Sequence, residues 1–180
     1  MANYLVTGAE GFIGSALAEK LIAENHKVVT VDNLSTGDFK NIPDQCEYII
    51  GDLSEKDIIN KLNKYEFDAI FHIAGQSGGM KSFEDPIYDM NSNIASTILL
   101  LEYCRRNNCN KFIYASSMSV YGQKNECPIN ETDDLDPTSF YAVGKMASEK
   151  YMNIYSEEYD IYTIALRLNN VYRLGQIWTI

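Results

Sequence analysis

The sequence lacks a surplus of positive charge and lacks any long apolar run. Fifteen Lys and Arg residues stand against 25 Asp and Glu residues, which gives a formal net charge of -10. Such a chain repels a polyanion unless it carries a basic patch, and no cluster of basic residues is present. No apolar run approaches the ~18 residues of a membrane span, and "MANYLVTG" lacks the basic start and apolar stretch of a signal peptide. We therefore expect a cytoplasmic protein that binds neither nucleic acid nor membrane.

Cysteine and histidine are scarce as well. The four cysteines (Cys46, Cys104, Cys109 and Cys127) show no Cys-x-x-Cys spacing, and no pair of histidines lies near them. Structural zinc sites need ligands at such spacings, and a cytoplasmic chain keeps its thiols reduced. Free thiols and the absence of a metal site are therefore expected.

What the sequence does contain is a regular alternation of short apolar runs with segments of helical period. The apolar runs span residues 3–7, 27–31, 46–50, 68–74, 111–116 and 162–168. The longer segments predict helices over 12–25, 86–106 and 139–158. Near-continuous apolar strands separated by helices form parallel sheets covered on both faces, because each crossover must carry a helix. The sequence predicts an α/β fold with a doubly wound parallel sheet.

Three glycines follow the first predicted strand and begin the first predicted helix. In "LVTGAEGFIG" these are Gly8, Gly11 and Gly14. Glycines at this place permit a tight turn, a close approach of backbone N–H groups to a pyrophosphate, and close packing of helix on sheet. The positive end of the helix lets an acidic protein hold an anionic dinucleotide.

Two aspartates follow later strands. Asp32, eighteen residues beyond Gly14, can accept hydrogen bonds from both ribose hydroxyls of an adenosine, and its charge would repel a 2′-phosphate. NAD is thus favoured over NADP. In "YIIGDLSEKD", Asp52 is positioned to bind the adenine, with Leu53 against its face.

The candidate chemistry lies in two later stretches. "SFYAVGKMASEKY" places Tyr141 and Lys145 four residues apart on a predicted helix, so both side chains project from one face. A cation beside a phenol favours the phenolate and suits Tyr141 to act as a base. "FIYASSMSVYG" places Ser116 and Ser117 at the carboxyl end of a predicted central strand, where open α/β sheets bind ligands.

These motifs resemble those of the extended short-chain dehydrogenase/reductases, and within them the NAD-dependent epimerases and dehydratases of the UDP-glucose 4-epimerase type. The resemblance runs from about Asn3 to Gln176 and rests on "TGAEGFIG", "GDL", "HIAGQ", "SSMSVYG", "YAVGK" and "LRLNNVY". It implies a Rossmann-type, NAD-binding single domain over residues 1–180. It also implies a homodimer built through a four-helix interface from the helices at 86–106 and 139–158.

The resemblance implies a role for each matching residue. The expected catalytic residues are Ser117, Tyr141 and Lys145. The expected cofactor residues are Gly8, Gly11, Phe12, Ile13, Gly14, Asp32, Asn33, Asp52, Leu53, Ile73, Ala74, Gly75, Asn93, Ser116, Tyr141 and Lys145. Ser117 and Asn170 are expected to contact a nucleotide-diphosphate sugar, and His72 is expected to pack at a strand end and not to act as a base.

The implied reaction is a transient oxidation of the sugar at C4. Dehydratases of this family carry an Asp-Glu pair directly after the serine, and uronate decarboxylases carry a Glu at the second of those places; here Met118 and Ser119 stand there. The sequence therefore favours a UDP-hexose or UDP-hexuronate 4-epimerase of polysaccharide biosynthesis. A dehydratase, and an NAD-binding fragment without turnover, remain alternatives.

The end of the chain departs from the family pattern. Arg173 and Leu174 stand where related segments have Gly and Pro, and "QIWTI" is what Gln-Asn-Met-Asp-Asn becomes when one adenine is lost from its codons. We interpret this tail as a frameshift or truncated gene. The small C-terminal substrate domain of the family is expected to be largely missing.

Overall fold

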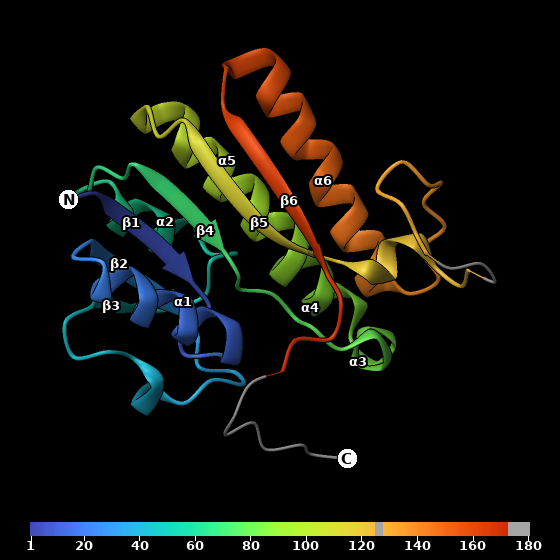
Figure 1. Cartoon of the computed structure of the whole chain (residues 1–180), viewed down its shortest axis with the longest axis horizontal. Helices are drawn as coiled ribbons and strands as arrows, with labels where there is room; N and C mark the ends of the chain where they lie inside the picture. The colour runs from blue at the N-terminus through green and yellow to red at the C-terminus, as the bar shows by residue number, and fades with distance from the viewer. Residues whose placement is uncertain (125–127, 173–180) are drawn as a thin grey trace.

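A six-stranded parallel sheet forms the centre of the protein (Figure 1). The computed structural model describes residues 1–124 and 128–172. The strands are β1 (Asn3–Thr7), β2 (Lys27–Asp32), β3 (Glu47–Ile50), β4 (Ala69–His72), β5 (Lys111–Ser117) and β6 (Tyr162–Leu168). Their order is β3-β2-β1-β4-β5-β6, and every pairing is parallel. This is the strand order of dinucleotide-binding sheets, so the predicted doubly wound parallel sheet is confirmed.

Helices connect most of the strands. They are α1 (Phe12–Ala23), α2 (Lys56–Leu62), α3 (Gly79–Glu84), α4 (Pro86–Met90), α5 (Ser96–Asn107) and α6 (Phe140–Tyr159), with short 3-10 turns η1 (Phe39–Asn41) and η3 (Met118–Tyr121). A π-helical turn, η2 (Asn91–Ala95), joins α4 to α5, so the expected helix over 86–106 is continuous in direction but locally widened. Within the described ranges, no helix is both long and apolar enough to cross a membrane.

The larger of two apolar cores lies between the sheet and helices α2, α5 and α6. It includes Leu5, Ile70 and Phe112 from the strands, Leu100 from α5 and Met152 from α6, all at most 1% exposed. Burial of this apolar surface is the main stabilising contribution to the fold.

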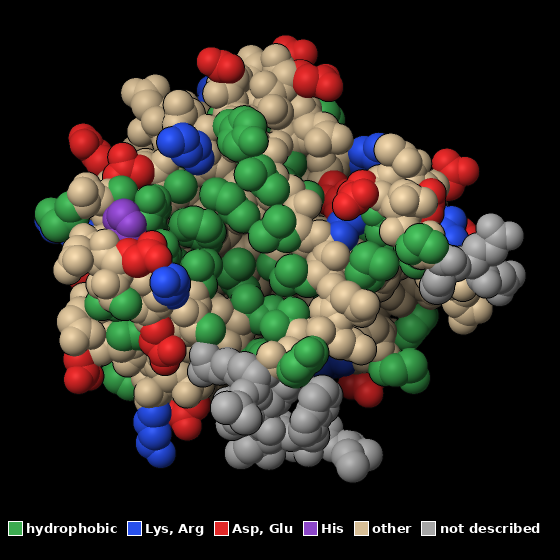
Figure 2. Space-filling model, viewed as in Figure 1, with side chains coloured by type: hydrophobic (Ala, Val, Ile, Leu, Met, Phe, Trp, Pro, Cys, Tyr) green, Lys and Arg blue, Asp and Glu red, His purple; other side chains and the backbone are tan. Residues whose placement is uncertain are grey.

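The opposite face of the sheet is covered over one half only. Helix α1 packs Ala18 and Leu21 against Val6 and Val28 of β1 and β2. Among the described residues, β6 has a helix on one face alone, because its packed elements are β5, α6 and η3 (Figure 1). Figure 2 shows the consequence, a broad apolar surface over the middle of this face.

The residues of β6 on that surface are large and apolar. Tyr162, Ile164 and Leu166 alternate along the strand and are 65%, 37% and 44% exposed. Arg167, which points the other way, pairs with Glu149 of α6. We call the side chains of Tyr162, Ile164 and Leu166 the open face of β6.

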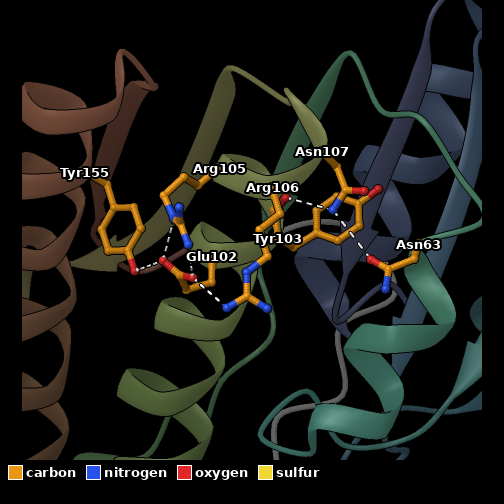
Figure 3. A network of polar contacts seen from close by, with 7 residues as sticks. All are labelled: Asn63, Glu102, Tyr103, Arg105, Arg106, Asn107 and Tyr155. Carbon is orange, nitrogen blue, oxygen red and sulfur yellow. Dashed lines mark hydrogen bonds and ion pairs between the residues drawn. The ribbon is translucent and has the colours of Figure 1, made fainter.

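Hydrogen bonds and ion pairs connect the helices on the face of the sheet that carries α2, α5 and α6, which we call the covered face (Figure 3). The carboxylate of Glu102 on α5 accepts hydrogen bonds from Arg105, Arg106 and the hydroxyl of Tyr155 on α6, at 2.7 to 3.0 Å. The hydroxyl of Tyr103 donates to the carbonyl of Tyr65 beyond α2, at 2.8 Å. Helix α5 is thereby tied to its neighbours on both sides.

Candidate functional site

The turn after β1 is shaped by its glycines. Gly8 has a φ of +67°, which glycine adopts without steric cost. A Cβ on Gly14 would lie 2.1 Å from the carbonyl oxygen of Gly8, so α1 can approach the strand this closely only with glycine there. The backbone N–H of Gly11 donates to Gly8 at 3.1 Å and closes the turn.

A hollow of about 210 Å³ lies between this turn, the ends of β2 and β3, and the loop after β4. Twelve of the expected cofactor residues line it: Gly8, Gly11, Phe12, Ile13, Gly14, Asp32, Asn33, Asp52, Leu53, Ile73, Ala74 and Gly75. It lies at the carboxyl ends of β1 and β4, the neighbouring strands between which the strand order of the sheet reverses, and such sheets bind ligands at this point. Ser35, Thr36, Ser77 and Tyr88 also line it, and no motif in the sequence identified them.

Two carboxylates at the hollow are held by local hydrogen bonds. Asp32 accepts from the N–H of Leu34 at 2.8 Å and from that of Glu10 at 3.3 Å. Asp52 accepts from Ser54 and from the side chain of Asn33. Burial raises the pKa of Asp52, but these hydrogen bonds outweigh burial and hold the pKa below its ordinary value. Asp52 is thus ionised at neutral pH.

A second hollow, of about 500 Å³, adjoins the first and shares Phe12, Ile13, Ile73, Gly75 and Ser77 with it. All three expected catalytic residues, Ser117, Tyr141 and Lys145, line this hollow together with Asn170. Ser117 ends β5 and caps η3, and its Oγ accepts from the N–H of Ser119 at 3.2 Å. Residues from β5, α6 and the end of β6 therefore meet at one place.

Lys145 is buried close to the ring of Tyr141, with 4% of its surface exposed. Its Nζ donates to the carbonyl of Ala115 at 2.9 Å and lies 4.6 Å from the ring centre of Tyr114 and 5.6 Å from that of Tyr141. Burial lowers the pKa of the ammonium, and the charges of Tyr141 and Asp89 partly oppose this shift. A buried cation this close to a phenol is an arrangement that stabilises a phenolate.

Ser116 lies on the lining of the second hollow, but its hydroxyl donates to the carboxylate of Glu149. Glu149 in turn holds Arg167 of β6, at 2.7 Å between Nη2 and Oε2. Sequence reasoning missed this buried ion pair. Glu149 lies one helical turn after Lys145, so its place on the inner face of α6 was readable, whereas its partner on β6 was not.

Asn93 and His72 lie behind the hollows and do not line them. Asn93, on the π-helical turn, is fully buried and donates to the carbonyl of Gln76 at 3.1 Å. Its Oδ1 approaches Gly75 so closely that a Cβ there would come within 2.5 Å. His72 bonds the hydroxyl of Thr7 at 2.8 Å, and burial, followed by the charge of Lys145, lowers its pKa to about 3. His72 is neutral at working pH and packs at the end of β4.

Comparison with known proteins identifies the family. Residues 4–175 match the model of the NAD dependent epimerase/dehydratase family. The chain belongs to this family. NAD is accordingly its cofactor.

Relatives and solved structures of this epimerase/dehydratase chain agree. UDP-glucose 4-epimerase of Mycolicibacterium smegmatis is 37% identical over 174 residues, which are 93% of this chain and 56% of that protein. The structure of UDP-glucose 4-epimerase with UDP-glucose from Thermotoga maritima superposes with a TM-score of 0.92 at 32% identity, over 94% of this chain and 56% of that one. The UDP-glucose 4-epimerase of Thermus thermophilus, in complex with NAD, gives a TM-score of 0.87 at 33% identity, over 92% and 54%. The chain thus spans about half the length of these relatives.

The tail that we interpret as a frameshift or truncated gene lies outside the described residues, which end at 172. Cys127 lies in the gap between residues 124 and 128 and is not described either. The remaining cysteines, Cys46, Cys104 and Cys109, are buried free thiols. In the described part of the chain, no group of His, Cys, Asp and Glu side chains is arranged to hold a metal ion.

Proposed function

We propose that this chain forms the cofactor-binding and proton-transfer part of an NAD-dependent UDP-sugar 4-epimerase, acting on a UDP-hexose or UDP-hexuronate. One observation carries the proposal: the glycine-lined hollow runs directly into the hollow lined by Ser117, Tyr141 and Lys145. A dinucleotide along both would have its adenosine at Asp32 and its nicotinamide beside Tyr141.

The geometry of the glycine turn is suitable for binding a pyrophosphate. The residues that begin α1 line the hollow, and the positive end of α1 favours an anion there. Asp32 has room to accept the ribose hydroxyls of adenosine, and its charge opposes a 2′-phosphate.

The proposed chemistry is a reversible proton transfer by Tyr141 at the C4 hydroxyl of the sugar. NAD supplies the hydride acceptor and donor. As the C4 hydride leaves, Tyr141 removes the hydroxyl proton and Ser117 holds the oxygen of the resulting 4-keto sugar. Lys145, whose Nζ lies 5.6 Å from the ring centre of Tyr141, stabilises negative charge on the phenol oxygen during the transfer and orients the nicotinamide ribose. The keto sugar then turns over and takes back hydride on its other face, with the proton returned from Tyr141.

The lining near Ser117 favours an epimerase over a dehydratase. A dehydratase needs an acid and a base to remove water from the keto sugar. The residues after Ser117 that line the hollow are Met118 and Ser119, which supply neither. The nearest buried carboxylate on α6, Glu149, is held by Ser116 and Arg167.

The test is epimerisation at C4 of UDP-glucose and UDP-glucuronate, followed by proton NMR in the presence of NAD. Tyr141→Phe should lower the rate at least ~100-fold, because general base catalysis typically contributes that much. Tyr151→Phe, which removes a hydroxyl from the same helix, is the matched control and should leave the rate unchanged. Full activity of Tyr141→Phe would overturn the assignment.

The second candidate is a dinucleotide-binding protein without turnover. A titration with NADH, followed by nicotinamide fluorescence, distinguishes it from the epimerase when it is combined with the epimerisation assay. Asp32→Ala should weaken binding at least about tenfold, because two charge-assisted hydrogen bonds are lost. Saturable binding of NADH without any epimerisation would favour the second candidate.

We also propose a homodimer through α4, α5 and α6. Exposed apolar side chains recur at helical spacing on α6, at Phe140, Val143, Tyr151 and Ile154, and the neighbouring segment adds Phe83, Ile87 and Met90. Pairing two such surfaces would bury this area in a four-helix interface. Val143→Glu should convert a dimer to a monomer in analytical ultracentrifugation, and a monomeric wild-type chain would contradict the proposal. Location in the cytoplasm stays a prediction.

A further inference from the structure

A carboxylic acid is buried inside the cofactor turn itself. Glu10 lies between Gly8 and Gly11 and is 1% exposed. Neither oxygen of its carboxyl group has a hydrogen-bond partner in the described part of the chain, and no described cation pairs with it. Burying a carboxylate without partners is costly, so the group is expected to be uncharged or to have a function that outweighs this cost.

The backbone of Glu10 connects the cofactor turn to the segment after β2. Its N–H donates to Oδ2 of Asp32 at 3.3 Å. Its carbonyl accepts from the N–H of Asp38 at 3.3 Å and from the side chain of Asn41 at 2.8 Å. Gly37 packs so tightly on Glu10 that an added Cβ would lie 2.7 Å from the Cβ of Glu10. The segment that follows Asp32 and carries Ser35 and Thr36 to the hollow therefore packs on the backbone and Cβ of Glu10.

The groups that face Glu10 add no positive charge. Burial, followed by interaction with the Asp32 carboxyl group, raises the pKa of Glu10 to about 8. From the segment before β3, Cys46 also faces Glu10, and burial followed by the charge of Glu10 raises the thiol pKa to about 11. Asp38 approaches with its backbone, while its side chain accepts from the N–H of Lys40. Near neutral pH, Glu10 is thus a neutral acid beside a second carboxyl group.

We propose that Glu10 is a positioning residue for the adenosine end of NAD, which holds the segment after β2 in place while protonated and weakens cofactor binding when it ionises. Protonated Glu10 adds no charge beside the Asp32 carboxyl group, which can then accept the ribose hydroxyls. Ionised Glu10 places a second, buried negative charge beside Asp32 and close to the dinucleotide phosphates. That charge opposes the anionic ligand and draws water beneath the segment. The proposal rests on the proposed placement of adenosine at Asp32.

The test is calorimetric titration with ADP, which carries the adenosine and a pyrophosphate but neither the second ribose nor the nicotinamide, so that Tyr141 and Lys145 contribute little to the pH profile. Wild-type affinity should be roughly tenfold lower at about pH 10 than at about pH 7, with the fall beginning near the pKa of Glu10. Glu10→Gln keeps the shape of the side chain without its titration. It should bind as tightly as the wild type at neutral pH and show a flat profile. Asp44→Asn, which removes an exposed carboxylate nearby, is the matched control and should keep the wild-type fall.

A second readout needs no ligand. Because folding raises the pKa of Glu10 above its ordinary value, its contribution to stability is fully present below about pH 4.5 and is lost as the pH rises to about 8. The difference in unfolding free energy between wild type and Glu10→Gln should therefore change across that range and stay constant above it. Affinity, by contrast, should change only above about pH 8.

The outcomes separate cleanly. A flat wild-type profile for ADP, or a fall that persists in Glu10→Gln, overturns the proposal. If Glu10→Gln does not fold, carbon-13 NMR of the wild-type carboxyl group decides, since a midpoint near its ordinary value overturns the proposal and one near about 8 supports it. Failure of the epimerase assignment would leave ADP binding intact, whereas a wrong placement of adenosine would leave Asp32→Ala without effect on it.

Discussion

Strands β2 and β6 look alike in sequence but are buried very differently. β2, "KVVTVD", has four buried residues, and β6, "YTIALRL", has none. The difference comes from the layers around them, because β2 lies between β1 and β3 and beneath α1, whereas β6 is an edge strand with α6 on one face. Parallel strands are normally covered on both faces, so the β6 half of the sheet is the less complete one.

The same division runs through the candidate site. The adenosine end, with Asp32 at the end of β2, belongs to the half that is covered on both faces. Ser117 and Asn170 lie at the ends of β5 and β6, in the half with the open face. The cofactor end thus lies beside strands that are buried on both faces. The proposed sugar end lies beside β6, whose apolar side chains on one face are exposed.

Truncating one isoleucine side chain in the buried core and one on the open face should give the largest difference in the free energy of unfolding. Ile70→Ala, in the fully buried core, should lower the free energy of unfolding by about 3 kcal/mol, because it leaves a cavity that the core cannot fill. Ile164→Ala, on the open face, should cost less than about 1 kcal/mol, because much of the side chain is already in water. Urea unfolding at neutral pH measures both. Equal losses would mean that the open face is covered in solution.

The sequence predicted the strands well because each apolar run is short and ends at turn residues. β1 occupies the predicted residues 3–7, and α6 begins one residue later than predicted, because Ser139 is its N-cap and accepts from the N–H of Ala142. The π-helical turn was not predictable, because the apolar period runs through it. The exposure of one face of β6 was not predictable either, because the sequence pattern of an apolar strand is the same whether or not a helix covers it.

The site divides in the same way. Gly8, Gly14 and Asp32 follow from local rules of turn and strand-end chemistry, and the structure brings them together at one hollow. No sequence pattern indicated that Glu10 is buried, because its burial depends on a segment that begins more than twenty positions later in the chain. The pairing of Glu149 with Arg167 likewise depends on which strand lies beside α6.

The hydrogen bonds of Glu102, between the helices on the covered face, should contribute a smaller and pH-dependent amount to the free energy of unfolding. Hydrogen bonds from Arg105, then from Tyr155 and Arg106, lower the pKa of Glu102 to about 2. Because folding depresses this pKa, the stabilisation is present above about pH 4.5 and is lost as the pH falls to about 2.

Glu102→Gln should therefore lower the free energy of unfolding by about 1 kcal/mol at neutral pH, a value limited by the partial exposure of these groups. The difference between mutant and wild type should vanish at the acid end of a pH series of urea unfolding curves. Glu24→Gln, whose partner Lys20 is also exposed, is the control and should have almost no effect. A difference for Glu102→Gln that persists in acid would contradict the assigned cause.

A charge on the open face should have the smallest effect on stability. Leu166 is 44% exposed and points away from α6, so Leu166→Lys should change the free energy of unfolding by no more than about 0.5 kcal/mol. The same change should reduce association of the chain at high concentration, measured by light scattering, because it interrupts a contiguous apolar surface. Val28→Lys, on the part of this face that α1 covers, should instead unfold the protein. If a longer polypeptide or a partner chain covers β6, Leu166→Lys becomes as costly there as Val28→Lys, because a charge would then be buried without a partner. The ratio of the two losses therefore measures how far the β6 half has been completed.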